Sequence, residues 1–109
     1  MTDLARLRKL QQIADLLKDR DLTRLGQASA RKMQIEAQLI ALDGAFSVQG
    51  LDPVVAGQII DRFGLWTTQR RISLNQQLAR ETAAWIETKA QAQRSFGRAE
   101  VLGKLVKRL

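Results

Sequence analysis

The sequence predicts an all-α fold, an antiparallel two-helix coiled-coil hairpin with a short helix at its tip. Residues 2–43 and most residues after Pro53 are rich in Leu, Ala, Gln, Arg and Lys, which lose little entropy on entering a helix. Pro53 is the only proline, and it follows the one segment, residues 44–52, in which helix-forming composition lapses. The 109 residues are therefore expected to form one domain, in which two helical stretches are joined once.

A first long helix is expected over about residues 2–43. Thr2 or Asp3 can cap it, because their side-chain oxygens accept hydrogen bonds from the free amides of a first turn. Apolar residues share one face at spacings of three and four: Leu4, Leu7, Leu10, Ala14 and Leu17. Leu22 breaks this spacing, so we expect the stripe to shift around the helix near Asp21, as in a coiled-coil stutter. The stripe then resumes through Leu25, Ser29, Lys32, Ile35, Leu39, Leu42 and Phe46.

The segment between the helices carries an end signal and a start signal. Gly44, Ser47 and Gly50 are expected to end the first helix, since glycine adopts left-handed conformations without a steric cost. Asp52 and Pro53 predict a helix start, in which a capping carboxylate precedes a proline whose missing N–H is not needed at the first helical position. The first helix is therefore expected to end in this segment, and residues 44–64 are expected to form the tip of the hairpin.

Two arrangements of the second half are open. If one helix continues from Pro53, residues 96–109 would project beyond the first helix, and large apolar side chains worth roughly 1.5–3 kcal/mol each would stay uncovered. If the chain breaks near Gly64, residues 53–63 form the short tip helix and about residues 65–108 form the second long helix. We favour the break, because it pairs Leu4 with Leu105, Leu10 with Ala99, and Leu22 with Ile86 or Trp85.

The second long helix has its own apolar stripe at helical spacing, formed by Leu74, Leu78, Trp85, Ala92, Phe96, Ala99, Leu102 and Val106. Trp85 is expected to pack in the seam between the helices, because it lies on this stripe. Trp66 stands outside the stripe, and Arg70 and Arg71 follow it. An aromatic ring beside paired arginines indicates a candidate site for an acidic or nucleic-acid partner.

Basic residues gather near both ends of the chain. The net charge is +7 and the isoelectric point is about 10.8, which favours acidic partners. Residues 1–12 carry a net charge of +2 and residues 98–109 carry +3. The predicted pairing brings both segments together as a basic end, formed by Arg6, Arg8, Lys9, Arg98, Lys104, Lys107 and Arg108. A helix dipole accounts for cations at the C-terminus of a helix but disfavours them at its N-terminus, so the combined cluster is a candidate partner site.

The side chains of most enzyme sites are missing. His, Cys and Tyr do not occur, which removes imidazole and thiolate metal ligands, thiol nucleophiles and the usual general bases. Asp15 and Asp19 share a helical face, but carboxylates on an exposed helix are ordinarily solvated charges. The glycines at 44 and 50 lack the Lys-Ser/Thr pair of a phosphate-binding loop. We expect no enzyme activity, no cofactor, no metal and no small-molecule substrate.

Targeting signals are also missing from the sequence. The N-terminus lacks the apolar core and cleavage site of a signal peptide. The uncharged runs 44–51 and 72–79 have eight residues each, whereas roughly 18–20 are needed to span a bilayer. The lack of cysteine suits a reducing compartment. We therefore expect a cytoplasmic protein without a membrane span.

Several features together resemble the FliJ/YscO family of small coiled-coil stalk proteins in flagellar and type III secretion export machinery. The first helix opens with Leu4-x2-Leu7-x2-Leu10, a glycine-containing turn follows, and the Gln/Arg-rich second helix holds Trp85 and the stretch Phe96-Gly-Arg-Ala-Glu-x-Leu. The resemblance implies that the end holding both termini enters the central hole of a hexameric export ATPase. It also implies contacts with export-gate proteins and escort chaperones, at the cytoplasmic face of a membrane-bound export apparatus.

Two other functions fit the same residues. A nucleic-acid-binding coiled coil would use the high isoelectric point and the Arg70 and Arg71 pair, and its binding would fall steeply with salt. A dimerising scaffold would instead pair the hairpin with a second copy as a homodimer, because two helices alone bury little apolar surface. Export stalk is the function we favour.

Overall fold

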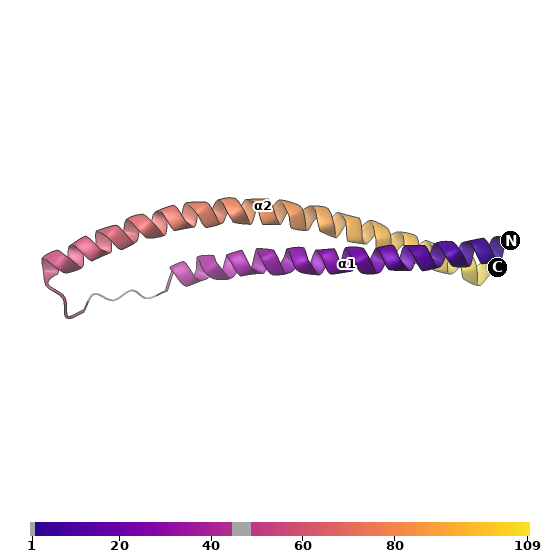
Figure 1. The fold of residues 1–109 in the computed structure, drawn as a ribbon, viewed down its shortest axis with the longest axis horizontal. Helices are drawn as coiled ribbons and strands as arrows, with labels where there is room; N and C mark the ends of the chain where they lie inside the picture. The colour runs from indigo at the N-terminus through magenta and orange to yellow at the C-terminus, as the bar shows by residue number, and fades with distance from the viewer. Residues whose placement is uncertain (1, 45–48) are drawn as a thin grey trace. The chain divides into compact units, whose positions relative to one another are not determined.

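The chain forms two α-helices in a computed structural model that describes residues 2–44 and 49–109 (Figure 1). Helix α1 comprises Asp3–Leu42 and helix α2 comprises Pro53–Arg108. The two helices pack antiparallel as a coiled-coil hairpin. The predicted all-α class and the antiparallel pairing are confirmed.

The contacts between the helices divide into two compact units. The terminal unit comprises Met1–Ala30 and Thr82–Leu109, so it contains both ends of the chain. The loop unit comprises Arg31–Glu81, the segment through which the chain turns. Each unit has its own buried residues and its own polar contacts across the helix pair.

Both helices begin at residues that the sequence indicates. Thr2 caps α1, since its Oγ1 accepts a hydrogen bond from the backbone N of Ala5 at 3.1 Å. Asp52 caps α2, since its Oδ1 accepts one from the backbone N of Val54 at 2.9 Å. Pro53 is the first residue of α2, as predicted.

The end of α1 is followed by a turn with the predicted glycines. The helix ends at Leu42, and the backbone N of Gly44 donates a hydrogen bond to Ala41 O at 3.2 Å. Gly50 has a φ of 84°, in the left-handed region that favours glycine. Two further residues of the predicted pattern lie outside the described residues: Phe46 and Ser47.

The separate short helix predicted over residues 53–63 is not present. Helix α2 runs without interruption from Pro53 through Gly64 to Arg108, so the predicted break near Gly64 is wrong. A glycine inside a helix costs about 1 kcal/mol relative to alanine. That cost is small where helix extends on both sides, because propagation is cooperative. A Cβ added at Gly64 would meet no atom within 4 Å, so no close contact requires glycine there.

In the terminal unit the helices meet along a narrow seam. Its buried residues are small or polar: Ala14, Asp21 and Ala28 on α1, and Ala92, Ser95 and Ala99 on α2. Along α1, buried or half-buried residues recur at alternating spacings of three and four from Leu4 to Ala28. This spacing is that of a coiled coil, and small side chains let the helix axes approach closely.

The predicted stutter near Asp21 is wrong. The seam passes through that point without a shift, because the polar residues Gln11, Lys18 and Asp21 occupy seam positions. Two large residues that the predicted stripes placed on the seam lie outside it, since Leu10 and Phe96 are 51% and 53% exposed. The buried seam residues of this unit are therefore small or polar, and Leu10 and Phe96 lie on its flanks.

In the loop unit Ile35 of α1 and Leu74 of α2 form the buried apolar core. Three polar contacts join α2 to α1 and to Asp43, which follows α1. Arg31 Nε lies 3.1 Å from Glu81 Oε2, a guanidinium nitrogen of Arg70 donates to Gln38 Oε1 at 3.2 Å, and one of Arg71 lies 2.6 Å from Asp43 Oδ1. These contacts hold the middle of α2 beside the end of α1.

The observed pairing of residues differs from the favoured prediction by about one heptad. Trp85 donates its indole N–H to Ser29 Oγ at 2.9 Å, whereas the prediction placed Trp85 opposite Leu22. The other alternative is wrong in its consequence, because residues 96–106 do not project beyond α1. A Cβ added at Gly103 would lie 3.5 Å from Gln11 Nε2. Registers one heptad apart present the same helix faces, so stripe spacing alone did not separate them.

Candidate interaction surfaces of the terminal unit

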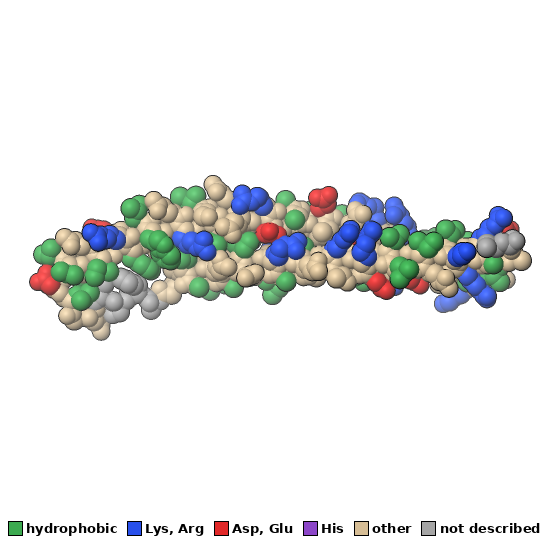
Figure 2. All heavy atoms as spheres, in the orientation of Figure 1, with side chains coloured by type: hydrophobic (Ala, Val, Ile, Leu, Met, Phe, Trp, Pro, Cys, Tyr) green, Lys and Arg blue, Asp and Glu red, His purple; other side chains and the backbone are tan. Residues whose placement is uncertain are grey.

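The terminal unit brings the two predicted basic segments to the same end of its helix pair (Figure 1). Figure 2 shows Lys and Arg side chains at this end, as well as elsewhere along both helices. All seven residues of the basic end are exposed. Only Lys104 has an acidic neighbour among the described residues, since its Nζ lies 3.6 Å from Glu100 Oε1. The other six cations are free to meet a partner.

The basic end surrounds the helix termini and is not a patch on one side. Successive residues of an α-helix are about 100° apart around its axis. Arg6 and Arg8 therefore project about 160° apart on α1, and Arg98 and Lys107 project about 180° apart on α2. A partner that contacts all of these cations must enclose the helix ends.

Helix stability explains only part of this cluster. Lys107 and Arg108 lie in the last turn of α2, where a cation is stabilising by about 0.3–1 kcal/mol. Arg6, Arg8 and Lys9 lie near the N-terminus of α1, where the helix dipole disfavours positive charge. The cations of α1 are therefore the stronger sign of an acidic partner.

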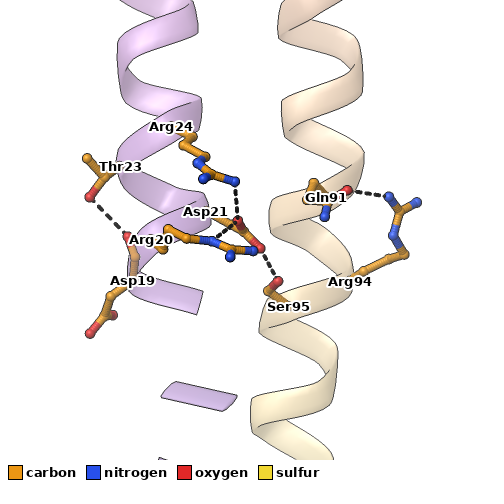
Figure 3. A network of polar contacts seen from close by, with 8 residues as sticks. All are labelled: Asp19, Arg20, Asp21, Thr23, Arg24, Gln91, Arg94 and Ser95. Atoms are coloured by element: carbon orange, nitrogen blue, oxygen red, sulfur yellow. Dashed lines mark hydrogen bonds and ion pairs between the residues drawn. The ribbon is translucent and has the colours of Figure 1, made fainter. Parts of the chain in front are cut away.

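A buried carboxylate network crosses the seam at Asp21 (Figure 3). Asp21 is 1% exposed and accepts a hydrogen bond from Ser95 Oγ of α2. Arg20 Nε lies 3.1 Å from Asp21 Oδ1, and a guanidinium nitrogen of Arg24 lies 3.9 Å from it. The hydrogen bonds from Ser95 and then Arg20 hold the pKa of Asp21 below its ordinary value of 3.8, although burial opposes this shift. The charged carboxylate thus fixes which turn of α2 lies opposite Asp21.

Trp85 packs against the seam, as its place on the apolar stripe predicts. It is half-buried, and its indole N–H donates to Ser29 of α1. Lys89 Nζ lies 5.0 Å from the centroid of the Trp85 ring, within the range of a cation–π contact. Trp85 therefore contributes to the pairing of the helices.

The second predicted site, Trp66 with Arg70 and Arg71, lies in the loop unit. Trp66 is 53% exposed, and its ring centroid lies 5.9 Å from that of Phe63. Trp66 and Arg70 line one open groove, but Arg71 does not line it and is held by Asp43. The structure therefore brings together two of the three residues.

An apolar groove of about 680 Å³ runs along one side of the terminal unit, and the sequence-based reasoning did not predict it. Leu10, Ile13 and Leu17 line it on α1, and Gly97 and Val101 line it on α2. Leu10 and Ile13 are each 51% exposed. A sequence signal existed, because these residues repeat at spacings of three and four beside the seam, but it merged with the stripe of the seam itself.

The buried role of Asp21 was missed in the same way. Ala14, Asp21, Ala28 and Ile35 are spaced by seven residues, which marks one position of a heptad. Only Ile35 of this series is a large apolar residue, so the series does not stand out from apolar spacing alone.

Comparisons with protein families, with curated proteins and with solved structures find no match to this chain. Among the described residues, no three acidic side chains come together as a metal site, and neither helix has a stretch long and apolar enough to cross a membrane. The likeness to the FliJ/YscO family thus stays a prediction from sequence pattern. The basic end and the apolar groove are the two surfaces on which a function can be argued.

Proposed function

We propose that this chain is a non-enzymatic coiled-coil stalk or adaptor, which docks its basic end into the ring of an export ATPase in flagellar or type III protein secretion. The observation that carries the proposal is the meeting of both basic segments at one end of the terminal unit. Because the cations point in opposite directions around both helices, an acidic ring cavity is the partner shape that contacts them together.

In this role the protein acts in the cytoplasm, at the cytoplasmic face of a membrane-bound export apparatus. Export-gate proteins and escort chaperones are the further partners that the FliJ/YscO resemblance implies. The narrow seam supports an adaptor role, because it leaves apolar side chains available on the flanks of the helix pair.

Two triple charge reversals test the docking. The first changes Arg6, Arg8 and Lys9 to Glu, and the second changes Lys104, Lys107 and Arg108 to Glu. Each removes three cations from the basic end, but their effects on helix stability oppose one another. Glutamate is favourable near the N-terminus of α1 and unfavourable near the C-terminus of α2. If both variants lose binding, the cause is therefore the loss of positive charge and not a change in helix stability.

The measurement is co-sedimentation with a purified hexameric flagellar export ATPase, together with its rate of ATP hydrolysis. We expect the unchanged chain to bind the hexamer and both variants to lose most of that binding. A matched control reverses Arg62 and Arg80, two exposed cations of the loop unit, and should bind normally. Retained binding by both triple variants would refute the docking of the basic end.

Duplex nucleic acid is the alternative partner for the same charge. The terminal unit carries twelve basic and six acidic residues, a net charge of +6. Phosphate-driven binding weakens steeply as salt rises, because each neutralised phosphate releases a counterion. A gel-shift assay on duplex DNA at low and at physiological salt separates the two functions. Tight DNA binding at physiological salt, with no binding of the ATPase, would favour the alternative.

A further inference from the structure

We propose that the apolar groove of the terminal unit is a docking site for an amphipathic helix that carries acidic residues on both sides of its apolar stripe. The groove adjoins the basic end and shares Arg98 with it, but the centre of the groove is apolar. It does not depend on the export function proposed above.

The α1 side of the groove is a second heptad stripe beside the seam. Its residues follow one another at spacings of four and three: Arg6, Leu10, Ile13, Leu17, Arg20 and Arg24. The three apolar members line the groove, and Leu10 and Ile13 are each half exposed. Arginines bound the apolar run at both ends. This pattern is the one by which a helix receives a further helix in a bundle.

The α2 side has a matching stripe, formed by Arg94, Arg98, Val101, Leu105 and Arg108. Arg94, Arg98 and Val101 line the same groove as the apolar residues of α1. Val101 is 57% exposed. The two stripes therefore face one shared space, in which an added helix would contact both α1 and α2 at once.

Charge around the groove selects an acidic partner. The charged residues that line the groove are Arg94 and Arg98, and no acidic residue lines it. Arg20 and Arg24, beyond one end of the apolar run, contact the buried Asp21. Asp15 and Asp19 lie about 140–180° around α1 from Leu10, on another face. Arg98 has no acidic partner among the described residues, and Arg94 donates to the neutral amide of Gln91 at 2.7 Å. A guanidinium group that has no acidic partner of its own can bind a carboxylate through paired hydrogen bonds.

The same charge disfavours a second copy of this chain as the occupant. Two copies that meet groove to groove would place arginine stripes against arginine stripes. Like charges brought together at an interface suppress association. An acidic helix instead matches the apolar centre and neutralises the rim, which is how amphipathic helices bind in grooves.

Gly97 provides the room for such a helix. A Cβ added at this position would meet no atom within 4 Å, so the missing side chain leaves space on the groove wall. The α1 stripe extends from Arg6 to Arg24, about 27 Å of helix. A partner helix of about 18 residues would match this length.

The test measures fluorescence anisotropy of a labelled helical peptide of about 18 residues, with leucines along one face and glutamates on both flanks. A second peptide replaces its glutamates by glutamine. We expect the acidic peptide to bind the full chain, and the neutral peptide to bind about tenfold more weakly. Gly97→Glu should weaken the binding of the acidic peptide by about tenfold or more, because the new side chain places bulk and negative charge on the groove wall.

Gly64→Glu is the matched control, since its added Cβ also meets no atom within 4 Å and it lies in the loop unit. It should leave binding of the acidic peptide unchanged, and circular dichroism should show full helix content in both variants. Absence of binding to the full chain, or equal binding by both glycine variants, would overturn the proposal. Light scattering that shows a dimer abolished by Gly97→Glu alone would also overturn it, in favour of a second copy.

Discussion

Leu74→Ala should be among the most damaging apolar substitutions in the loop unit. Leu74 is 1% exposed and is the largest fully buried apolar side chain of the described residues. The change removes three carbon atoms, worth about 0.8 kcal/mol each when fully buried, and the cavity that remains adds to the cost. We expect the free energy of unfolding to fall by about 3–4 kcal/mol. With a urea dependence of about 1–2 kcal/mol per M, the midpoint of unfolding should fall by roughly 1.5–4 M.

The assay is urea denaturation followed by circular dichroism and by tryptophan fluorescence, in which Trp66 reports on the loop unit. Leu16→Ala is the matched control, because Leu16 is 69% exposed and the chemical change is identical. Leucine and alanine are both good helix formers, so helix propensity contributes little. Leu16→Ala should lower the free energy of unfolding by less than about 1 kcal/mol. Equal costs for the two variants would show that Leu74 is not the core of the loop unit and would refute the observed pairing there.

Three further predictions concern a charge, a glycine and a helix cap. The pKa of Asp21 is lowered in the folded chain, so its carboxylate stabilises the fold at pH values above 3.8, its ordinary pKa. That stabilisation is lost as the pH falls through the lowered pKa. Melting temperatures at about pH 6 and about pH 3 should therefore differ more for the unchanged chain than for Asp21→Asn, and an equal difference would contradict the buried network. Gly97→Ala should raise the free energy of unfolding by about 1 kcal/mol in thermal melting, because the added methyl group meets no atom within 4 Å; a lower melting temperature would show a contact at this position. Asp52→Ala should cost about 1 kcal/mol and speed amide exchange at Val54, whose N–H loses its acceptor, whereas unchanged exchange would show that the cap is not used.

The sequence was sufficient for the features that depend on local chemistry. Leu, Ala, Gln, Arg and Lys favour helix by their own entropy, so both helices were predictable from composition. Asp52 and Pro53 marked the start of α2 through a cap and a fixed φ, and the structure has both. The meeting of the two basic segments followed from antiparallel pairing alone.

The pairing of residues was not predictable, because it depends on a balance among similar registers. A slide of one heptad leaves every stripe facing the seam and changes only which residues are neighbours. The contacts that select the register are a few polar ones, such as Ser95 with Asp21 and Trp85 with Ser29. Neither pair stands out in a sequence read for large apolar residues. The continuity of α2 was missed because a continuous helix was expected to leave residues 96–109 beyond α1, whereas a Cβ added at Gly103 would lie 3.5 Å from Gln11 Nε2 of α1.

The small residues of the seam link the stability of this hairpin to its capacity to bind. Ala14, Ala28, Ala92 and Ala99 bury little apolar area each, so the terminal unit gains less from its own pairing than leucines would supply. Larger apolar side chains lie on the flanks of the seam, where Leu10, Ile13 and Val101 are about half exposed. A third helix that covers these flanks would add apolar burial that the two helices cannot obtain from each other. Binding of such a partner should therefore raise the stability of the terminal unit, and the leucine-rich acidic peptide should raise its melting temperature in proportion to its affinity.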